Sequence, residues 1–187
     1  MEIQQIDPSL HTLIAKAIQT STREVFSTML SLEIEPGEMR VESKPPSAQS
    51  GMVALIGLAG QWSGTGSLAC SGEFACQMAA NFLATSYEHV NEEVFDALGE
   101  IANMIIGNVK AALEEKLGPM GLSTPTIIYG RNLQTRGAHI HDWTVVPFHC
   151  GAERMYVQVC VAPNTKWERS NMPAGFQLPL VVPVQGI

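Results

Sequence analysis

The sequence has few basic residues. Its 11 Lys and Arg stand against 18 Asp and Glu, which gives a formal net charge of −7. This balance repels the phosphate backbone of nucleic acids and the anionic face of a membrane. We therefore expect neither nucleic acid nor a membrane as a partner.

Long hydrophobic runs are also lacking. No apolar stretch reaches the roughly 20 residues that a membrane helix needs. The polar start MEIQQIDPSLH has neither the basic nor the apolar region of a secretory signal. We expect the protein to lie in the cytoplasm.

Cysteine is scarce and not paired in the sequence. The four cysteines, Cys70, Cys76, Cys150 and Cys160, form no C-x-x-C pair, so we expect them to be reduced and mostly buried. His139 and His141 would share one face of a strand with His149 nearby, but they have no carboxylate or Cys partner at ligand spacing. We therefore expect no metal site.

What the sequence does contain is enough apolar material for one core. Hydrophobic residues make up 45% of 187 residues, which favours a single globular domain. We place this domain at residues 1–163. Residues 164–187 form a separate apolar extension, in which Pro173, Pro179 and Pro183 exclude an ordinary helix.

Capping residues and apolar periodicity predict three helices. A long first helix begins at Asp7-Pro8 and keeps helical spacing to Leu32, and a second begins after Ser71. A third begins after Asn91 and runs to about Leu117, where Gly118-Pro119 ends it.

Strands are predicted between and after these helices. They lie near residues 38–41, 52–59, 67–70, 126–129, 140–149 and 155–162, with a turn over Gly60–Gly66. A phosphate-binding loop at that turn is the alternative, but the Gly-Lys-Ser/Thr ending is missing. The order helix, strands, helix, helix, strands indicates an α/β fold and two helix-then-hairpin units, weakly supported by the similar segments VFSTML (25–30) and VKAAL (109–113).

The third predicted helix has two different sides. One is apolar and predicts the core face: Val94, Leu98, Ile101, Ala102, Ile105, Val109 and Ala112. The other is a stripe of polar or small residues: Asp96, Glu100, Asn103, Gly107 and Glu114. This stripe could be an ordinary solvated face. However, Asn103, Gly99 and Gly107 are poor helix formers, which favours a surface that docks another protein.

The residues of this stripe also resemble a known family. Asp96-Ala-Leu-Gly-Glu100-Ile-Ala-Asn103, then Gly107-Asn108 and Pro125, are similar to the acid-x-x-x-Glu-x-x-Asn…Pro motif of the CheX/CheC chemotaxis phosphatases. The resemblance covers about residues 8–162. It implies a CheC-like α+β sandwich of pseudo-duplicated units, whose long helix carries the active site on its exposed face. CheC-type members carry the motif twice, but here the first helix near Glu24–Ser27 has Ser where Asn is needed, which is similar to the single-site CheX type.

The resemblance implies a function as well. The substrate would be the aspartyl phosphate of a CheY-like receiver domain, which supplies its own Mg²⁺ and Lys, so the protein needs no cofactor of its own. Asn103 would orient the attacking water and Glu100 would pair with the receiver's Lys. Asp96 and Gly107 would contact the partner, and Pro125 supports the motif. The resemblance also implies a homodimer, and the apolar strands near the sheet edges support this expectation.

Two alternative functions remain. A hydrolase with its own nucleophile fits poorly, because the sequence has no Gly-x-Ser-x-Gly elbow. A non-catalytic receiver-binding protein of the same fold, similar to flagellar switch proteins, is the main alternative, and Asn103 beside Glu100 favours catalysis over it.

Overall fold

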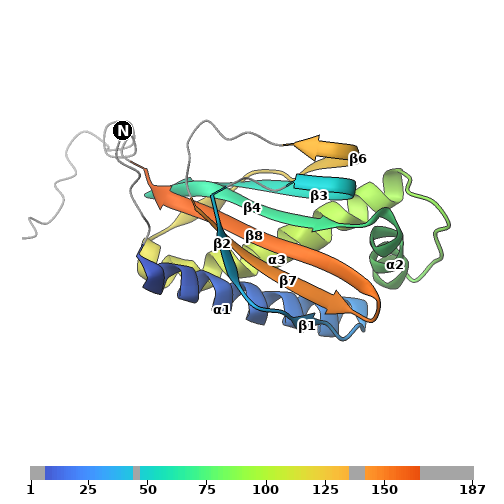
Figure 1. Cartoon of the computed structure of the whole chain (residues 1–187), viewed down its shortest axis with the longest axis horizontal. Coiled ribbons are helices and arrows are strands. Elements are labelled where there is room, and N and C mark those ends of the chain that lie inside the picture. Colours follow the sequence, from blue (N-terminus) through green and yellow to red (C-terminus); the bar gives the residue numbers. More distant parts are fainter. Residues whose placement is uncertain (1–6, 44–46, 135–141, 165–187) are drawn as a thin grey trace, which may run out of the picture.

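The described residues form one antiparallel sheet and three α-helices (Figure 1). The computed structural model describes residues 7–43, 47–134 and 142–164. The helical elements are α1 (Pro8–Val25), the π-helical turn η1 (Phe26–Leu30), α2 (Gly72–Leu83) and α3 (Glu92–Leu117). The strands are β1 (Glu35–Pro36), β2 (Arg40–Glu42), β3 (Ser47–Gly60), β4 (Trp62–Cys70), β5 (Met120–Leu122), β6 (Thr126–Gln134), β7 (Trp143–Cys150) and β8 (Glu153–Pro163).

The sheet is built from two hairpins, β3–β4 and β7–β8. They meet in the middle of the sheet, where β4 pairs with β8 from Trp62↔Pro163 to Cys70↔Met155. β1 and β2 extend the β7 edge, and β5 and β6 extend the β3 edge. The predicted α/β class and order of elements are confirmed.

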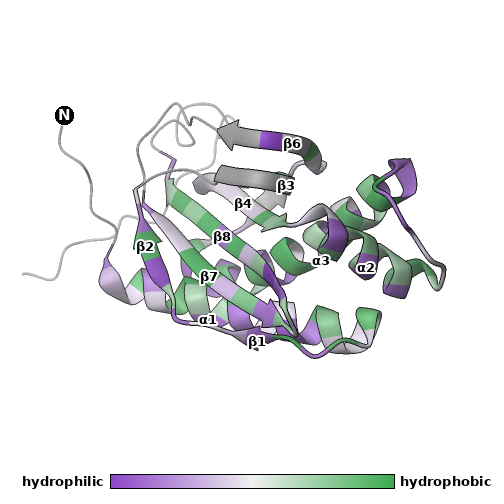
Figure 2. Ribbon diagram, turned by 45° about the vertical axis from the view of Figure 1, so that its right-hand side comes forward, coloured by the Kyte–Doolittle hydropathy of each residue, from purple (hydrophilic) through white to green (hydrophobic). Residues whose placement is uncertain are grey.

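Helices α1 and α3 cover one face of this sheet (Figure 1). Helix α1 packs mainly on β7, and α3 packs on β3, β4, β5 and β6. Helix α1 precedes the β3–β4 hairpin in the sequence but covers the β7–β8 hairpin, and α3 precedes β7–β8 but covers β3–β4. The helix of each helix-then-hairpin unit therefore covers the hairpin of the other unit. Figure 2 shows the helices with hydrophobic residues along one side and hydrophilic residues along the other. Their apolar sides form one core with the inward residues of β8: Met155, Val157, Val159 and Val161.

The first helix is shorter than predicted. It starts as expected, with the Asp7 carboxylate accepting a hydrogen bond from Ser9 N at 2.9 Å. However, α1 ends at Val25 and the chain continues as the π-helical turn to Leu30, followed by Ser31 at φ 52°. The Thr28 hydroxyl donates to the Glu24 carbonyl at 2.6 Å, and such bonds from Thr to the preceding turn weaken regular helix.

The turn predicted over Gly60–Gly66 is wrong for most of its length, because strand β4 begins at Trp62. Its glycines serve close packing. A Cβ on Gly64 would clash with the Cys160 backbone of β8, and one on Gly66 would clash with the Ile106 side chain of α3. Glycine is needed here where another backbone or side chain approaches a strand closely.

Candidate functional site

Helix α3 carries the predicted site residues, and its bounds agree with the prediction. The Asn91 side chain accepts a hydrogen bond from Val94 N at 3.0 Å, and Glu92 and Glu93 lie in the first turn, where acidic residues favour a helix start. At the other end Gly118 has a φ of 79°. Local capping therefore fixes where the site helix begins and ends.

The core face of α3 is nearly as predicted. Six of the seven predicted inward residues are buried: Val94, Leu98, Ile101, Ala102, Ile105 and Val109. The buried side is wider than predicted and also includes Ala97, Ile106, Leu113 and Leu117. Ala112 is exposed instead, because it faces a groove between α1 and α3. The prediction for Ala112 was wrong because periodicity does not show where a neighbouring helix leaves a gap.

The residues of the opposite stripe differ in their exposure to solvent. Asp96 and Glu100 are exposed, and Asn103 and Gly107 are partly buried. Glu114 has a structural role, since its carboxylate accepts from Met120 N at 2.8 Å and lies 2.9 Å from Lys110 Nζ. These two contacts, the Met120 hydrogen bond first, lower the pKa of Glu114. The open part of the stripe is therefore its first half, from Asp96 to Gly107.

A loop between β5 and β6 lies beside this open part. A Cβ on Gly99 would lie 3.7 Å from Pro125, and one on Gly107 would lie 3.7 Å from Leu122. Pro125 and Leu122 therefore flank the helix one turn before and one turn after Asn103. Asn103, between these two contacts along the helix, is partly buried, and Glu100 is exposed.

Ser123 fixes this loop to the sheet. Its hydroxyl accepts from Gly57 N at 2.8 Å and donates to the Thr124 carbonyl at 2.9 Å. Its own N–H donates to the Gly57 carbonyl at 2.9 Å. No local sequence pattern marks Leu122 or Ser123, because their partners lie far away in the sequence.

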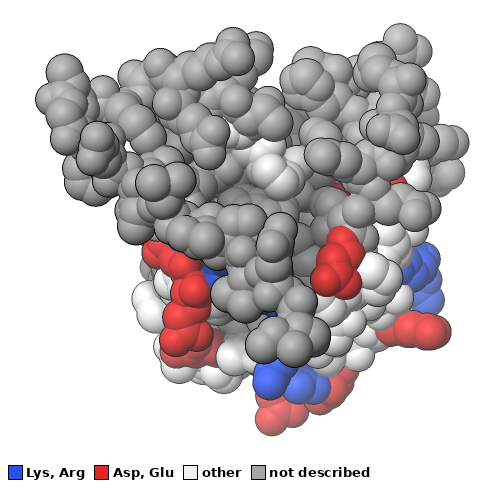
Figure 3. Space-filling model, turned by 90° about the vertical axis from the view of Figure 1, so that its left-hand side faces the viewer, with Lys and Arg blue, Asp and Glu red and all other residues white. Residues whose placement is uncertain are grey.

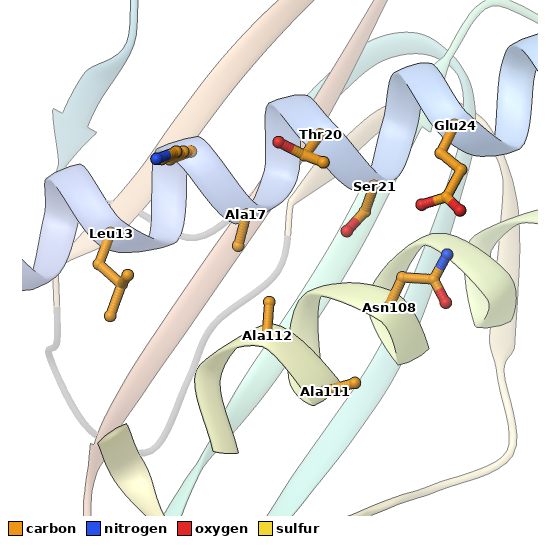
Figure 4. Close-up of a pocket in the computed structure, with 9 residues that line it drawn as sticks. Leu13, Ala17, Thr20, Ser21, Glu24, Asn108, Ala111 and Ala112 are labelled. Carbon is orange, nitrogen blue, oxygen red and sulfur yellow. The ribbon is translucent and has the colours of Figure 1, made fainter. Parts of the chain in front are cut away.

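A groove of about 450 Å³ runs between α1 and α3 (Figure 4). Small side chains line it from both helices, and Glu24 and Asn108 point toward each other across it. Lys16 supplies a positive charge on the α1 side. Since Ala111 belongs to both the groove and the exposed face of α3, the groove continues the surface that begins at Asp96.

The two long helices can be compared residue by residue from their N-caps, Asp7 and Asn91. With this offset of 84 residues, the buried positions of α1 coincide with those of α3 from Leu10/Val94 to Val25/Val109 almost throughout. Lys16 then occupies the position of Glu100, and Gln19 that of Asn103. The prediction that Glu24–Ser27 corresponds to the motif on α3 is therefore wrong. At the position of Glu100, α1 has the positive charge of Lys16.

Cys70, Cys76 and Cys160 are free and buried, and Cys150 is free and partly buried. Burial raises the pKa of the Cys160 thiol to about 11. In the described part of the chain no three His, Cys, Asp or Glu side chains are grouped as metal ligands. His139, His141 and the extension after Asn164 lie outside the described residues.

The surface charge agrees with the composition. On the described part of the face in Figure 3, Asp, Glu, Lys and Arg are interspersed and form no continuous basic patch. Among the described residues, no helix has both the length and the apolar character needed to span a membrane.

The sheet topology is that of a CheC-like fold, and α3 carries the acid and amide side chains of the candidate site. A family model described as chemotaxis phosphatase CheX matches residues 52–149, just over half of the chain. The chain therefore belongs to the CheX family. The matched part contains Glu100, Asn103 and Pro125, and it excludes α1.

Individual relatives agree with this assignment. The CheY-P phosphatase CheX of Thermotoga maritima is 26% identical over 124 residues, which cover 66% of this chain and 79% of that protein. The crystal structure of CheX from Vibrio vulnificus has a TM-score of 0.71 at 28% identity and covers 80% of this chain and 99% of that chain. The fold is also that of Borrelia burgdorferi CheX, solved as a CheX-CheY-BeF3-Mg²⁺ complex, with a TM-score of 0.64 at 23% identity over 78% of this chain and 96% of that chain.

Proposed function

We propose that this protein accelerates hydrolysis of the aspartyl phosphate on a CheY-like receiver domain. Three observations support the proposal: membership of the CheX family, the CheY-P phosphatase among its relatives, and the CheX-CheY complex among its structural neighbours. The single observation that carries the chemistry is the placement of Asn103, one turn after the exposed Glu100 and flanked by Gly99 and Gly107.

Asn103 orients the attacking water in this mechanism. An amide offers both a donor and an acceptor, so it holds a water molecule in line with the phosphorus without acting as a base. Acyl phosphates already hydrolyse unaided, and the helper contributes mainly by positioning. Asn103 is partly buried, which reduces the freedom that the amide loses when it engages the water.

Glu100 sets the register of docking. Its exposed carboxylate pairs with the lysine of the receiver's phosphorylation site through a charge-assisted hydrogen bond. Asp96, one turn earlier and also exposed, extends the negative surface toward the partner. Gly107 presents no side chain, so the receiver backbone approaches the helix closely there.

The receiver supplies the remaining charge. Its Mg²⁺ neutralises the phosphoryl oxygens, and this chain brings no cofactor of its own. The reaction takes place in the cytoplasm, where phosphorylated receivers act as signals.

The proposal is tested by phosphate release from CheY-like receivers phosphorylated with acetyl phosphate. Decay of the phosphoreceiver followed against protein concentration gives a turnover rate and an apparent affinity. Asn103→Ala should lower turnover by about 10² to 10³, roughly 3 to 4 kcal/mol, with little change in affinity. Gln19→Ala is the matched control, because Gln19 holds the equivalent position on α1, and it should leave both constants unchanged.

Glu100 should mainly affect the affinity for the receiver, whereas Asn103 should affect the turnover rate. Glu100→Gln leaves the receiver lysine without its charged partner, which costs about 2 to 5 kcal/mol of binding. Both variants should fold, since their side chains do not enter the core. Full turnover in Asn103→Ala, or a wild type that binds the phosphoreceiver and slows its decay, would favour a non-catalytic receiver-binding protein instead.

A further inference from the structure

Tyr129 is the most exposed of the large apolar side chains in the described part of the chain. Its exposed fraction is 55%, against 48% for Val41 and 44% for Met29 and Leu83. A single exposed aromatic is common in proteins and needs no explanation by itself. The surroundings of this ring make it different.

The ring is held in one position before any partner arrives. It lies 6.1 Å from the Phe95 ring of α3, centroid to centroid, with the planes tilted by 55°. The ring also lies close to Gly72, the first residue of α2, where a Cβ would lie 3.5 Å from Tyr129 Cε2. Strand pairing with Met52 of β3 fixes the backbone. A ring held in this way loses little conformational entropy on binding.

Beside the ring the surface is concave. A hollow of about 810 Å³ is bounded by Tyr129, by the start of α2 and by the segment leading into α3. Ser71, Tyr87 and Val90 contribute to its walls. A side chain of a partner can therefore contact the Tyr129 ring from the side as well as from above.

This aromatic surface adjoins the proposed catalytic stripe. Phe95 precedes Asp96 by one residue and Glu100 by five, or about 7.5 Å along the helix axis. A protein partner of ordinary size covers about 800 Å² per side, a patch about 16 Å in radius. Tyr129 therefore lies within reach of a receiver whose phosphorylation site contacts Glu100 and Asn103.

The charges around the ring specify the kind of partner. Glu92, Glu93 and Asp96 are all exposed at the start of α3, so an acidic rim lies next to the apolar ring. Interfaces commonly have this form, with an aromatic anchor inside a polar rim, and Tyr is one of the residues enriched among the few that carry most of the binding energy.

We propose that Tyr129 is the aromatic anchor of the receiver-docking surface and that it determines affinity for the receiver without taking part in the chemistry. The occupant is the same receiver domain, which presents an apolar contact with basic residues beside it. The inference rests on the proposed function and extends it from Glu100 and Asn103 to strand β6.

The experiment measures two constants for each variant with full-length protein. Affinity is measured by titration with a CheY-like receiver that carries Mg²⁺ and beryllium fluoride, and turnover is measured with the same receiver phosphorylated by acetyl phosphate. Tyr129→Ala should weaken binding by about tenfold or more and change the turnover rate by less than about twofold. Tyr129→Phe should keep most of the affinity, because it keeps the ring.

Val41→Ala is the matched control. Val41 is an exposed apolar residue on β2, at the opposite edge of the sheet, and its removal should change neither constant. Circular dichroism of each variant shows whether the fold is retained.

The outcomes separate this inference from the proposed function. Wild-type affinity in a folded Tyr129→Ala protein overturns the inference and leaves the phosphatase proposal intact. A wild type that neither binds nor dephosphorylates any receiver overturns both. If Tyr129→Ala instead changes the mass of the protein in solution, the ring covers a second copy of the chain and the inference is wrong.

Discussion

At the scale of single residues, Gly107 is better explained by function than by folding. A Cβ on Gly107 would make only an ordinary van der Waals contact, at 3.7 Å from Leu122. Alanine would therefore fit there and favour the helix by about 1 kcal/mol. Since Gly107 is only partly buried, its missing side chain is consistent with close approach of another protein, whereas Gly99 is buried against Pro125 and Ile127.

His11 gives a prediction of pH dependence. It is 5% exposed on α1, and one ring nitrogen lies 2.7 Å from the Thr144 hydroxyl of β7. Burial lowers the pKa of His11, and the charge of Asp142 offsets this in part. In the unfolded chain the pKa of this histidine is about 6.5. Below that pH the unfolded chain binds a proton more readily than the folded protein does, so stability falls as pH decreases.

The test is urea unfolding of the wild type and of His11→Gln at pH 7.5 and pH 5.5. The wild type should lose more stability between these pH values than the variant, by up to about 1.4 kcal/mol. An equal loss in both proteins would show that the ring titrates normally in the folded state.

At the scale of elements, the loop between β5 and β6 links the sheet to the site helix. Ser123 bonds the loop to Gly57 of β3, and Pro125 and Leu122 pack against α3 on either side of Asn103. The position of the loop therefore fixes the part of the surface that lies next to Asn103.

Ser123→Ala tests this positioning role. The loss of the two hydrogen bonds of the Ser123 hydroxyl should lower the free energy of unfolding by about 1 to 2 kcal/mol. A looser loop should also reduce turnover by about threefold without changing receiver affinity. Ser43→Ala is the control, because Ser43 bonds Asp142 at 2.9 Å in an exposed setting next to β2. A variant that loses stability but keeps full turnover would show that the loop only supports the fold.

At the scale of the whole molecule, the sheet edge away from the proposed receiver-docking surface carries an exposed apolar side chain. β2 at this edge presents Val41. Unprotected sheet edges tend to pair with other chains, and natural proteins cover them. Together with the family resemblance, this supports the prediction of a homodimer.

Light scattering at tens of micromolar protein checks this prediction. A dimer gives a mass of about twice 20.2 kDa, and a mass near 20.2 kDa would contradict it. If Tyr129 docks the receiver, the dimer must form without covering that ring, so Tyr129→Ala should keep the wild-type mass.

The sequence by itself determined the local elements and the site helix. Asp7, Ser71 and Asn91 each cap the helix that was predicted to follow, and the apolar spacing of α3 gave the centre of its buried side. Capping and periodicity act over a few residues, so a linear pattern contains them completely. For the same reason the motif residues Asp96, Glu100 and Asn103 could be placed on one face before the structure was known.

Only the tertiary structure decided what lies around that face. Gly64 and Gly66 looked like turn residues, but they lie in a central strand because β8 and α3 approach it closely. The positions of Ser123 and Tyr129 depend on partners in β3, α2 and α3 that are distant in the sequence. Contacts of this kind arise from the packing of whole elements, and no short segment contains the information that sets them.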